Sequence, residues 1–559
     1  MQRLIECVPN FSEGRDQTVI DAIARRIETV EGVKLLDVDP GRATNRTVIT
    51  FVGPPEEVVE AAVRAIAKAT ELIDMSRHTG AHPRFGATDV CPLVPVSGVT
   101  MDETVEYAHE LARRLADELG LTVYCYENAA QSPERRNLAD VRAGEYEGLV
   151  SRLQDPAWKP DFGPAEFNPR SGATAVGARR FLVAYNVNLN TTSTRRANAI
   201  AFDVRERGRL KRTGDPVTGE VVLGDDGEEV WIPGSLKEVK AIGWYINEYG
   251  IAQISMNLTD ISVTPVHVAF DEVRARADAR GVFVTGSELV GLIPLDAMLE
   301  AGRHYLRKQQ RSTGVADSEL IKIAVKSLGL DELAPFDPRQ RIIEYAIEDR
   351  LDRLVDLPLK RFVEETASES VAPGGGSVSA ALGALGAALA TMVANLSSHK
   401  RGWDERWEEF STWADRGKAC HDELLALIDA DTDAFNEIMT AFAMPQDADA
   451  EKTARREAIE SATRRAIEIP LRVMEVSLAS MDVVAAMAEA GIPASVSDAG
   501  VGALCARSAV MGAYLNVRIN AATLRDESQA DDYVRRGREL QDQAVALETE
   551  ILATVDQRL

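Results

Sequence analysis

Short apolar runs alternate with amphipathic stretches in the first third of the chain. Residues 34–39 (KLLDVD) and 46–53 (RTVITFVG) are β-rich runs bounded by Gly, Pro and Asn, which predicts two strands. Residues 54–73 (PPEEVVEAAVRAIAKATELI) begin with proline and acids and then place apolar residues at helical spacing. The front of the chain therefore predicts β-α-β units.

The same alternation resumes after a polar, proline-containing stretch at residues 155–180. Residues 181–190 (FLVAYNVNLN) and 251–260 (IAQISMNLTD) predict strands, and residues 265–285 predict a strand, a helix and a strand. Residues 207–234 predict an inserted polar loop or small hairpin, because DPVTGE and DDGE are turn sequences. A second α/β subdomain is therefore expected from about residue 180.

Strand patterns end near residue 357, and long helical segments follow, which predicts an all-α bundle. We expect two α/β subdomains at 1–180 and 181–335, each an α+β sandwich with ferredoxin-like β-α-β units. A linker at 336–356 and an all-α domain at 357–559 complete the expected organisation.

One segment of the predicted bundle, residues 377–398, carries no charge over a length that could span a bilayer. Its residues are mostly Ala, Gly, Ser and Thr, which gain little from contact with lipid. A bundle interior requires the same all-round apolar character. We therefore expect a buried helix and not a membrane span.

Composition narrows the class of protein. A hydrophobic content of 45% with 27% charged residues is typical of globular chains. The net charge of −25 argues against nucleic-acid or anionic-membrane partners, which need a large basic surface. The 5 cysteines are scattered, and the first residues lack the apolar core of a signal peptide. We expect a reducing, cytoplasmic location.

The pair His78 and His82 has the i, i+4 spacing with which a helix can hold a metal ion. Gly80 lies between them, and Pro83 disfavours helical backbone at His82. No acidic third ligand follows before Asp89. The pair is therefore expected on a loop, without a metal.

On that loop, His82 is followed by proline, and Arg77 and Arg84 flank the segment. An imidazole held in this way suits a general acid/base in a site for anions. The alternative from these residues alone is that both histidines are ordinary polar side chains on a surface loop.

Polar clusters occur elsewhere in the front region. Residues 7–16 (CVPNFSEGRD) combine Asn10, Ser12 and Glu13 before a predicted helix, where backbone N–H groups could meet an anion. Residues 37–47 (DVDPGRATNRT) include Asn45 and Arg46. Each cluster also fits the plain requirements of turns and helix caps.

Two further clusters lie in the helical third. Three glycines in residues 370–379 (SVAPGGGSVS) precede a helix that Ser377 could cap, which suits an anion but lacks the lysine of a nucleotide-binding loop. Asp429, Asp431 and Asp433 lie within one helical run and lack the spacing of a calcium loop. They form either a solvated face or include one functional carboxylate with a raised pKa.

Taken together, these motifs resemble one known family. They are ECVPNFSEGRD, LLDVDPGRATNRTVITFVGPPE, LIDMSRHTGAHPRFGATDVCP, RAGEYEGL and DFGP at the front, and APGGGSV, LIDADTDAF and GAYLNVRIN behind. In this order they resemble the bifunctional formimidoyltransferase-cyclodeaminases over nearly the full length. Residues 207–234 are longer than the corresponding loop expected for that family.

The resemblance implies two folate reactions of histidine degradation. The front would transfer the formimidoyl group of N-formimidoyl-L-glutamate to N5 of tetrahydrofolate, with folate held between two α/β subdomains. The helical part would then release ammonia and form 5,10-methenyltetrahydrofolate. The resemblance further implies polyglutamated tetrahydrofolate as co-substrate, no metal or nucleotide, and a homo-oligomer with bundle and transferase dimer interfaces.

The resemblance also implies site residues. The catalytic histidine corresponds to His82 and the aspartate of ring closure to Asp431. The folate-binding stretch corresponds to Gly163, Pro164, Ala165, Glu166, Phe167, Asn168, Pro169, Arg170, Ser171 and Gly172. Further candidates for substrate contact are Asn10, Asp39, Asn45, Arg46, Arg84, Gly375, Gly376, Asp498, Asn516 and Asn520.

Three alternatives stay open from the sequence. The front could accept a formyl donor, which differs by oxygen in place of nitrogen. The back could act as a methenyltetrahydrofolate cyclohydrolase. The chain could also be a folate-binding scaffold that has lost one or both activities.

Overall fold

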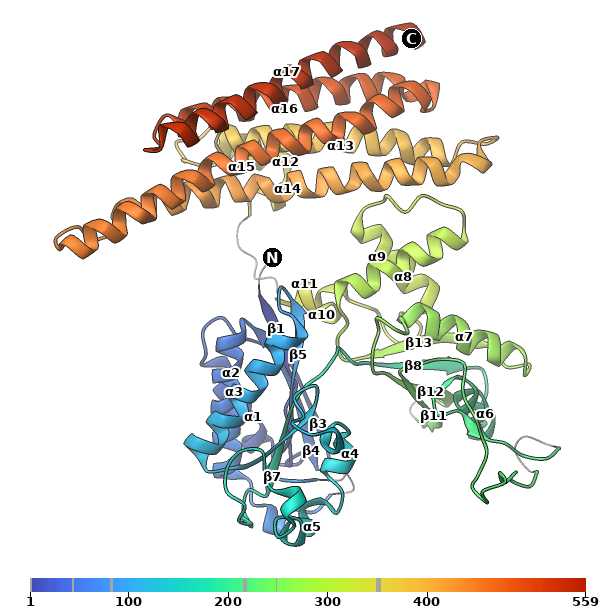
Figure 1. Cartoon of the computed structure of the whole chain (residues 1–559). Helices are drawn as coiled ribbons and strands as arrows, with labels where there is room; N and C mark the ends of the chain where they lie inside the picture. The colour runs from blue at the N-terminus through green and yellow to red at the C-terminus, as the bar shows by residue number, and fades with distance from the viewer. Residues whose placement is uncertain (1–2, 43–44, 81–83, 215–218, 248, 348–352) are drawn as a thin grey trace. The chain divides into compact units, whose positions relative to one another are not determined.

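The structure is a computed structural model that describes residues 3–42, 45–80, 84–214, 219–247, 249–347 and 353–559. The described chain divides into two units (Figure 1). The first contains residues up to 298 together with 328–347, and the second contains 299–327 together with 353–559.

The first unit begins with a seven-stranded mixed sheet in the order β1-β4-β2-β5-β7-β6, with β3 paired to β4. The strands are β1 (Leu4–Cys7), β2 (Asn10–Phe11), β3 (Lys34–Gly41), β4 (Arg46–Gly53), β5 (Thr88–Ser97), β6 (Thr122–Glu127) and β7 (Ala173–Ala178). Strand β7 runs parallel to β5 and β6, and the other pairs are antiparallel. The strands predicted at 34–39 and 46–53 are confirmed.

Three helices pack against this sheet: α1 (Gln17–Glu28), α2 (Pro55–Leu72) and α3 (Met101–Leu119). Their apolar faces bury Ile23, Ile27 and Leu111 among the strand residues. Proline at N1 starts α2, as the sequence predicts, and a Thr100–Glu103 capping box starts α3. Shorter helices, α4 (Leu138–Val141) and α5 (Glu145–Arg152), belong to a second small core with Tyr124 and Phe85.

A second sheet of four antiparallel strands has the order β11-β12-β8-β13. It contains β8 (Val183–Leu189), β11 (Val239–Ile246), β12 (Ile251–Leu258) and β13 (Val284–Val290). Helices α6 (Thr194–Val204) and α7 (Val266–Asp278) contact each other and this sheet. The predicted second α/β subdomain is therefore confirmed.

One local prediction in this subdomain is wrong. The segment PVHVAF was expected as a strand, but α7 begins at Val266 and runs through it. Its alternating apolar residues imitate a strand, whereas Ala269, Val273 and Ala277 continue at helical spacing and are all buried. Pro265, in extended conformation, precedes the first turn.

The insertion at 207–234 contains a small hairpin, as predicted. Strands β9 (Arg209–Leu210) and β10 (Trp231–Ile232) pair antiparallel. Single bridges join Arg212 to Val221 and Leu223 to Glu229. The hairpin extends away from the four-stranded sheet beside α6 (Figure 1).

The segment expected as a linker is partly folded. It contains α10 (Pro338–Arg341) and α11 (Ile343–Ile347). The N–H of Ile293 donates to the carbonyl of Arg341, and the N–H of Ile343 donates to the carbonyl of Ile293. Ile343 is buried, so this part of the segment packs with the first unit.

The second unit is helical, as predicted. It contains most of α8 (Leu295–Lys308), α9 (Asp317–Leu328), α12 (Leu359–Thr366), α13 (Gly375–Ser398), α14 (Trp407–Ala443), α15 (Asp449–Ala490), α16 (Val496–Ala521) and α17 (Glu527–Arg558). Its short 3-10 turns are η4 (Leu354–Asp356), η5 (Asp404–Arg406) and η6 (Pro493–Ser495), whereas η1 (Met75–Arg77), η2 (Pro133–Arg135) and η3 (Pro156–Trp158) belong to the first unit. A Cβ on Gly386 would lie 2.9 Å from the Gly502 carbonyl oxygen, so glycine permits the close approach of α13 and α16.

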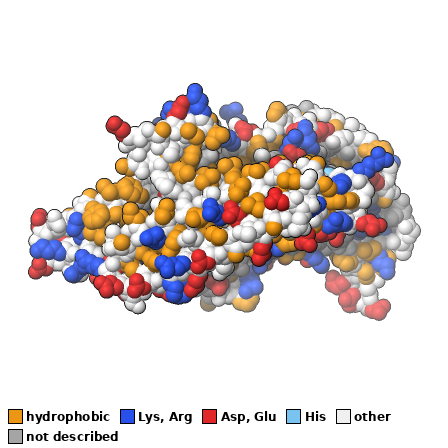
Figure 2. All heavy atoms as spheres, turned by 90° about the horizontal axis from the view of Figure 1, so that it is seen from above, with side chains coloured by type: hydrophobic (Ala, Val, Ile, Leu, Met, Phe, Trp, Pro, Cys, Tyr) orange, Lys and Arg blue, Asp and Glu red, His pale blue; other side chains and the backbone are white. Residues whose placement is uncertain are grey.

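Helix α13 is long and apolar enough to span a bilayer by length and composition, alone among the described helices. In the bundle, 61% of its most apolar window is buried, and it packs against α14, α15 and α16. The prediction of a buried helix is confirmed. Apolar side chains also gather on the outer surface of the bundle (Figure 2).

Candidate active sites

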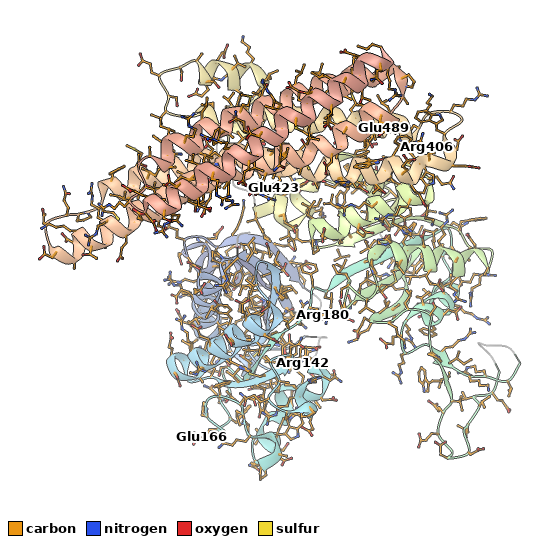
Figure 3. The ribbon with its side chains drawn as sticks, turned by 45° about the horizontal axis from the view of Figure 1, so that its top comes forward. Arg142, Glu166, Arg180, Arg406, Glu423 and Glu489 are labelled. Atoms are coloured by element: carbon orange, nitrogen blue, oxygen red, sulfur yellow. The ribbon has the colours of Figure 1, made fainter. Side chains whose placement is uncertain are left out.

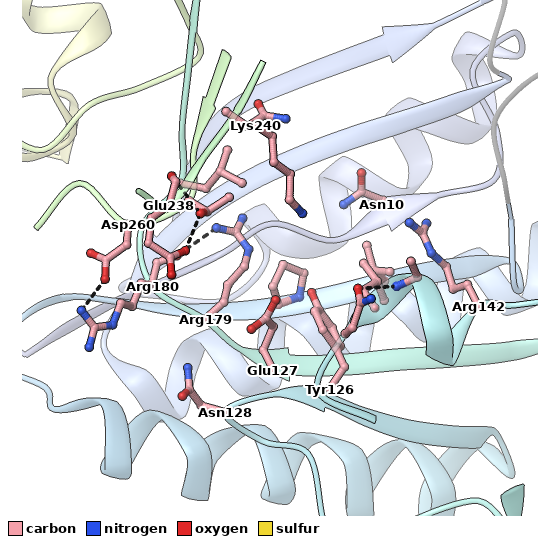
Figure 4. A pocket seen from close by; sticks show the side chains of 18 of the residues that line it. Asn10, Tyr126, Glu127, Asn128, Arg142, Arg179, Arg180, Glu238, Lys240 and Asp260 are labelled. Atoms are coloured by element: carbon pink, nitrogen blue, oxygen red, sulfur yellow. Dashed lines mark hydrogen bonds and ion pairs between the residues drawn. The ribbon is translucent and has the colours of Figure 1, made fainter. Parts of the chain in front are cut away.

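A polar cavity of about 860 Å³ lies in the first unit and is lined by residues from both sheets (Figure 4). Its basic side chains are Arg46, Arg142, Arg179, Arg180 and Lys240, and its acidic side chains are Glu127, Glu238 and Asp260. Arg180 and Asp260 form an ion pair with each other. The remaining balance is cationic in a chain of net charge −25, so the cavity suits an anionic ligand.

Asp89, which does not itself line the cavity, organises two of these cations. Its buried carboxylate accepts a hydrogen bond from Arg142 Nη1 at 2.7 Å and lies 3.5 Å from Arg46 Nη1. It also accepts from the N–H of Phe85 at 3.0 Å. Asn10 Oδ1 accepts two hydrogen bonds from Arg46, at 3.0 and 2.6 Å. Burial lowers the pKa of Arg46, and Asp89 opposes that effect.

Asn10 and Arg46 were predicted from the sequence as site residues, and both line the cavity. His82 lies outside the described residues. The loop that leads to it is held by Asn45, whose Nδ2 donates to the carbonyl of Thr79 at 3.0 Å and whose Oδ1 accepts from the N–H of Gly14 at 3.0 Å. Asn45 thus positions this loop and does not line the cavity.

His78 also contacts Asn45. Its Nε2 lies 2.8 Å from the Asn45 carbonyl oxygen, and because a carbonyl only accepts, Nε2 carries the proton. Burial lowers the pKa of His78, and this hydrogen bond opposes the shift. The arrangement gives His78 a role in holding the loop.

Two other residues predicted from the sequence, Arg84 and Asp39, do not line the cavity. Arg84 forms ion pairs with Glu145 and Glu147 and does not line the cavity. Asp39 lies on the edge strand β3 with its side chain exposed, also outside the cavity lining.

The predicted folate stretch, residues 163–172, does not line the cavity either. Glu166 is exposed and lies apart from Arg142 and Arg180 (Figure 3). Hydrogen bonds inside the stretch stabilise its conformation: Asn168 Oδ1 accepts from the N–H groups of Arg170 and Ser171. The predicted folate stretch therefore lies apart from the basic side chains that line the cavity.

The same stretch contacts both flanks of the histidine loop. The carbonyl of Arg170 accepts from the N–H of Met75 at 2.9 Å, and the carbonyl of Ser171 accepts from the N–H of Ala87 at 2.8 Å. These backbone bonds place residues 170–171 beside the two ends of the loop that contains His82. Two features predicted separately are thus neighbours in the fold.

A second pocket, of about 140 Å³, lies in the helical unit where α13 begins. Four of the sequence candidates line it: Gly375, Asp431, Asn516 and Asn520. These residues come from α13, α14 and α16, which are far apart in sequence. Phe435 adds an apolar wall.

Asp431 is the ionisable group of this pocket. Its Oδ2 accepts from the N–H of Ser377 at 2.9 Å and from the Ser377 hydroxyl at 3.1 Å. Burial raises the pKa of Asp431, while these two hydrogen bonds oppose the rise. A carboxylate whose pKa is raised accepts a proton more readily than an ordinary solvated aspartate, which suits general acid–base catalysis.

Gly376 is required by this geometry. A Cβ at that position would collide with the Asp431 carboxylate. Glycine at this position in the first turn of α13 thus lets the helix close over the aspartate. The backbone N–H of Ser377 in that turn donates to the carboxylate, as expected for a free N–H at a helix N-terminus.

The three aspartates of the LIDADTDAF motif have different environments. Asp429 accepts from the N–H groups of Leu354, at 2.7 Å, and Val355, at 3.3 Å, and so fastens η4. Asp433 is exposed. Only Asp431 among the three lines the pocket.

The two asparagines of α16 donate to helix carbonyls. Asn516 Nδ2 donates to Gly512 and Asn520 Nδ2 to Ala466, at 3.1 and 2.7 Å. Asp498 is not brought to this pocket, because it lies in the first turn of the same helix, 18 residues before Asn516. That separation corresponds to roughly 27 Å along a helix.

Comparison with known proteins decides the family. The model described as formiminotransferase domain, N-terminal subdomain, matches residues 4–179, and the formiminotransferase domain model matches residues 184–348. The formiminotransferase-cyclodeaminase model matches residues 358–539. The formimidoyltransferase-cyclodeaminase of Mus musculus is 44% identical over 529 residues, which cover 94% of each chain. The chain belongs to the formimidoyltransferase-cyclodeaminase family.

Separate relatives match each part of this formimidoyltransferase-cyclodeaminase family member. Glutamate formimidoyltransferase of Streptococcus pyogenes serotype M1 is 39% identical over 307 residues, 55% of this chain and 94% of that protein. Methenyltetrahydrofolate cyclohydrolase of Methylorubrum extorquens is 33% identical over 201 residues, 36% of this chain and 97% of that protein. The resemblance predicted from the motifs is confirmed.

Sequence reasoning missed Asp89, which pairs with two arginines of the cavity, and three basic residues of its lining, namely Arg142, Arg179 and Lys240. A signal existed for the first two. Asp89 interrupts an apolar, β-rich run, and Arg142 opens the RAGEYEGL motif. Arg179 and Lys240 carry no comparable local pattern, because their approach to the cavity depends on the packing of two sheets.

Proposed function

We propose that this chain catalyses two successive folate reactions. The first transfers the formimidoyl group from N-formimidoyl-L-glutamate to N5 of tetrahydrofolate, and the second converts 5-formimidoyltetrahydrofolate to 5,10-methenyltetrahydrofolate and ammonia. The observation that carries the proposal is the 44% identity to a formimidoyltransferase-cyclodeaminase over 94% of both chains. Two separate polar sites, one in each unit, fit two separate reactions.

For the transfer, N5 attacks the amidine carbon and the bond from that carbon to the glutamate nitrogen breaks. One proton leaves the attacking nitrogen and one reaches the departing nitrogen, which suits a single imidazole that titrates near neutrality. We assign this role to His82. The cationic cavity supports binding of the carboxylates of both substrates, with Arg46 and Arg142 held in place by Asp89.

For ring closure, N10 attacks the formimidoyl carbon and the carbon–nitrogen bond to the departing amine then breaks. With the formimidoyl nitrogen protonated as an amidinium, the proton lost by N10 is the one that the amine needs to leave as ammonia, and the positive charge stays on the methenyl product. Asp431 is assigned to carry it, because its carboxylate lines the pocket and burial raises its pKa. Asn516 and Asn520 are assigned to contact the pterin ring.

A second candidate concerns the helical part alone. Its similarity to a methenyltetrahydrofolate cyclohydrolase favours testing hydrolysis of 5,10-methenyltetrahydrofolate as well as its formation. In the same way, a formyl donor is tested beside the formimidoyl donor. Both alternatives use a folate, so they leave the assigned sites unchanged.

The remaining expectations concern the setting of the enzyme. We assign it to histidine degradation in the cytoplasm, with polyglutamated tetrahydrofolate as the co-substrate and no metal or nucleotide. A homo-oligomer is supported by exposed apolar residues of α16, where Leu515 is 62% and Ile519 is 68% exposed. Cys7, Cys91 and Cys125 are buried and unpaired by disulfides, which fits a reducing compartment.

The test is a paired assay of the purified chain. N-formimidoyl-L-glutamate and tetrahydrofolate are supplied, and methenyltetrahydrofolate absorbance and ammonia release are followed separately. Equal yields of both products support the proposal. Activity with N-formylglutamate alone, or methenyltetrahydrofolate hydrolysis with no ammonia release from the formimidoyl substrate, would replace it by the alternatives.

A further inference from the structure

A second basic pocket lies on the four-stranded subdomain. It has a volume of about 240 Å³ and is formed by α6 and the hairpin of residues 207–234. Its lining includes Arg195, Arg205, Arg209 and Arg212 together with Phe202 and Trp231. None of these residues lines the 860 Å³ cavity or the Asp431 pocket.

The arginines of this pocket are poorly neutralised. In the described part of the chain, Arg195, Arg205 and Arg212 form no ion pair with a carboxylate. Arg209 pairs with Asp203, which also pairs with Arg280. Four guanidinium groups around one small pocket repel each other, and in a chain of net charge −25 that arrangement is not explained by overall charge balance.

Backbone contacts hold two of the guanidinium groups in place. Arg205 Nε donates to the carbonyl of Gly208 at 2.8 Å, and Arg212 Nη1 donates to the carbonyl of Gly219 at 2.8 Å. Each bond uses one of the five N–H donors of an arginine, so most donors stay available to a ligand. Positioned forks of this kind bind carboxylate or phosphate groups in a bidentate manner.

Aromatic rings form the other part of the wall. The guanidinium carbon of Arg205 lies 3.9 Å from the centre of the Phe202 ring, and that of Arg207 lies 4.2 Å from the centre of the Trp231 ring. This stacking holds Arg205, which lines the pocket, and Arg207, which does not, against apolar surface. The pocket therefore offers clustered cations beside an apolar wall, which suits a ligand with both anionic groups and an apolar or aromatic body.

We propose that this pocket binds a small organic polyanion that carries two or more phosphate or carboxylate groups on an apolar or aromatic body. The site is separate from the transferase and ring-closure sites. Its ligand class follows from four arginines that converge on a space walled by Phe202 and Trp231.

The test is calorimetric titration of the full chain with ADP and with benzene-1,2,4-tricarboxylate, which separate the phosphate and carboxylate sources. Inorganic pyrophosphate and adenosine serve as probes without a ring and without charge. We expect at least one ring-bearing anion to bind with one site per chain, more tightly than pyrophosphate, and adenosine not to bind. Affinity should fall as salt is raised.

The paired variant is Arg195→Ser with Arg212→Ser, and the matched control is Arg274→Ser with Arg276→Ser on α7, where neither residue lines the pocket. Loss of two charge-assisted contacts should weaken binding by about 10-fold or more in the first variant only. Both variants should keep the KM values of both reactions.

Three results would overturn the proposal: no binding of either ring-bearing anion, equal weakening in both variants, or a raised substrate KM in the Arg195/Arg212 variant. The last would make the pocket an extension of the substrate site. Because the first two results are measured by titration without turnover, a failure of the proposed enzymatic function would leave them able to decide the proposal.

Discussion

The carboxylate of Asp431 accepts two hydrogen bonds from Ser377, one from the backbone N–H at 2.9 Å and one from the hydroxyl at 3.1 Å. Ser377 lies in the first turn of α13 and Asp431 in the middle of α14, so the contact exists only when the two helices pack. The two bonds favour the charged carboxylate, while burial favours the neutral acid. Asp431 is therefore held in a balance that suits reversible proton transfer.

Asp431→Asn should stop ring closure and leave formimidoyl transfer intact. The amide keeps the size of the side chain but cannot accept the proton of N10. General acid–base catalysis contributes about 10²–10⁴-fold, so ammonia release should fall by that order while 5-formimidoyltetrahydrofolate accumulates. Asp433→Asn, on the exposed side of the same helix, is the matched control and should release ammonia normally. Normal ammonia release from the Asp431 variant would show that Asp431 does not carry the proton of ring closure.

Ser377→Ala should move the pH dependence of ring closure. The hydroxyl hydrogen bond lowers the pKa of Asp431, so its loss raises that pKa further. Since the basic carboxylate form is the active one, the acidic limb of the rate profile should shift to higher pH. Ser379→Ala is the control, because its hydroxyl donates to the Gly375 carbonyl and not to Asp431. An unchanged limb in the Ser377 variant contradicts the argument.

His82→Ala should abolish formimidoyl transfer, whereas separately supplied 5-formimidoyltetrahydrofolate should still be cyclised. The two reactions are assigned to different units, so one substitution should not affect both. His78→Ala should reduce transfer much less, because its ring holds the loop through the Asn45 carbonyl. Rates of both half-reactions, measured on folded variants, check the assignment, and an equal loss of both reactions in the His82 variant would refute it.

Arg142→Gln should raise the KM for the anionic substrates of the transfer reaction. Arg142 lines the cationic cavity and is aligned by Asp89, which retains Arg46 as a partner in the variant. Loss of a charge-assisted contact should lower kcat/KM by about 10–100-fold, with ring closure unchanged. Arg136→Gln, an exposed neighbour, serves as the control. Equal kcat/KM values for the two variants would exclude Arg142 from substrate binding.

Glu6→Gln should stabilise the first unit at alkaline pH. Burial raises the pKa of Glu6 to about 7 from an ordinary 4.5, and the charge of Arg179 only partly opposes this. The folded state therefore loses stability as pH rises from 4.5 to about 7, because the carboxyl ionises freely in the unfolded chain while the buried group stays protonated until its raised pKa is reached. The variant removes this cost, which is at most about 3 kcal/mol.

Urea unfolding of the first unit at pH 5 and pH 8 checks this prediction. The advantage of the Glu6 variant over the parent chain should be larger at pH 8 than at pH 5. Glu28→Gln, an exposed change on α1, should show no such difference. An advantage that is the same at both pH values would contradict the linkage argument.

Local patterns predicted much of the fold. The β-rich runs that became β3 and β4, the helix α2 with its leading proline, and the all-helical last third are confirmed, because their periodicity states which face is buried. The prediction of a strand at PVHVAF was wrong because it also relied on periodicity alone. Five alternating residues fit a strand and the first turn of α7 equally well, and only packing against the sheet decided between them.

The sequence by itself determined which residue types gather in motifs, and so pointed to Asn10, Arg46, Gly375, Asp431 and Asn516, which line the two pockets. Tertiary structure alone separated Asp431 from Asp429 and Asp433, because burial and hydrogen bonding depend on neighbouring helices and not on spacing. Tertiary structure also determined which residues form the cationic cavity. Arg142, Arg179 and Lys240 come together only where residues from two sheets line one space. Contacts between residues far apart in sequence leave no local periodic pattern by which the chain could reveal them.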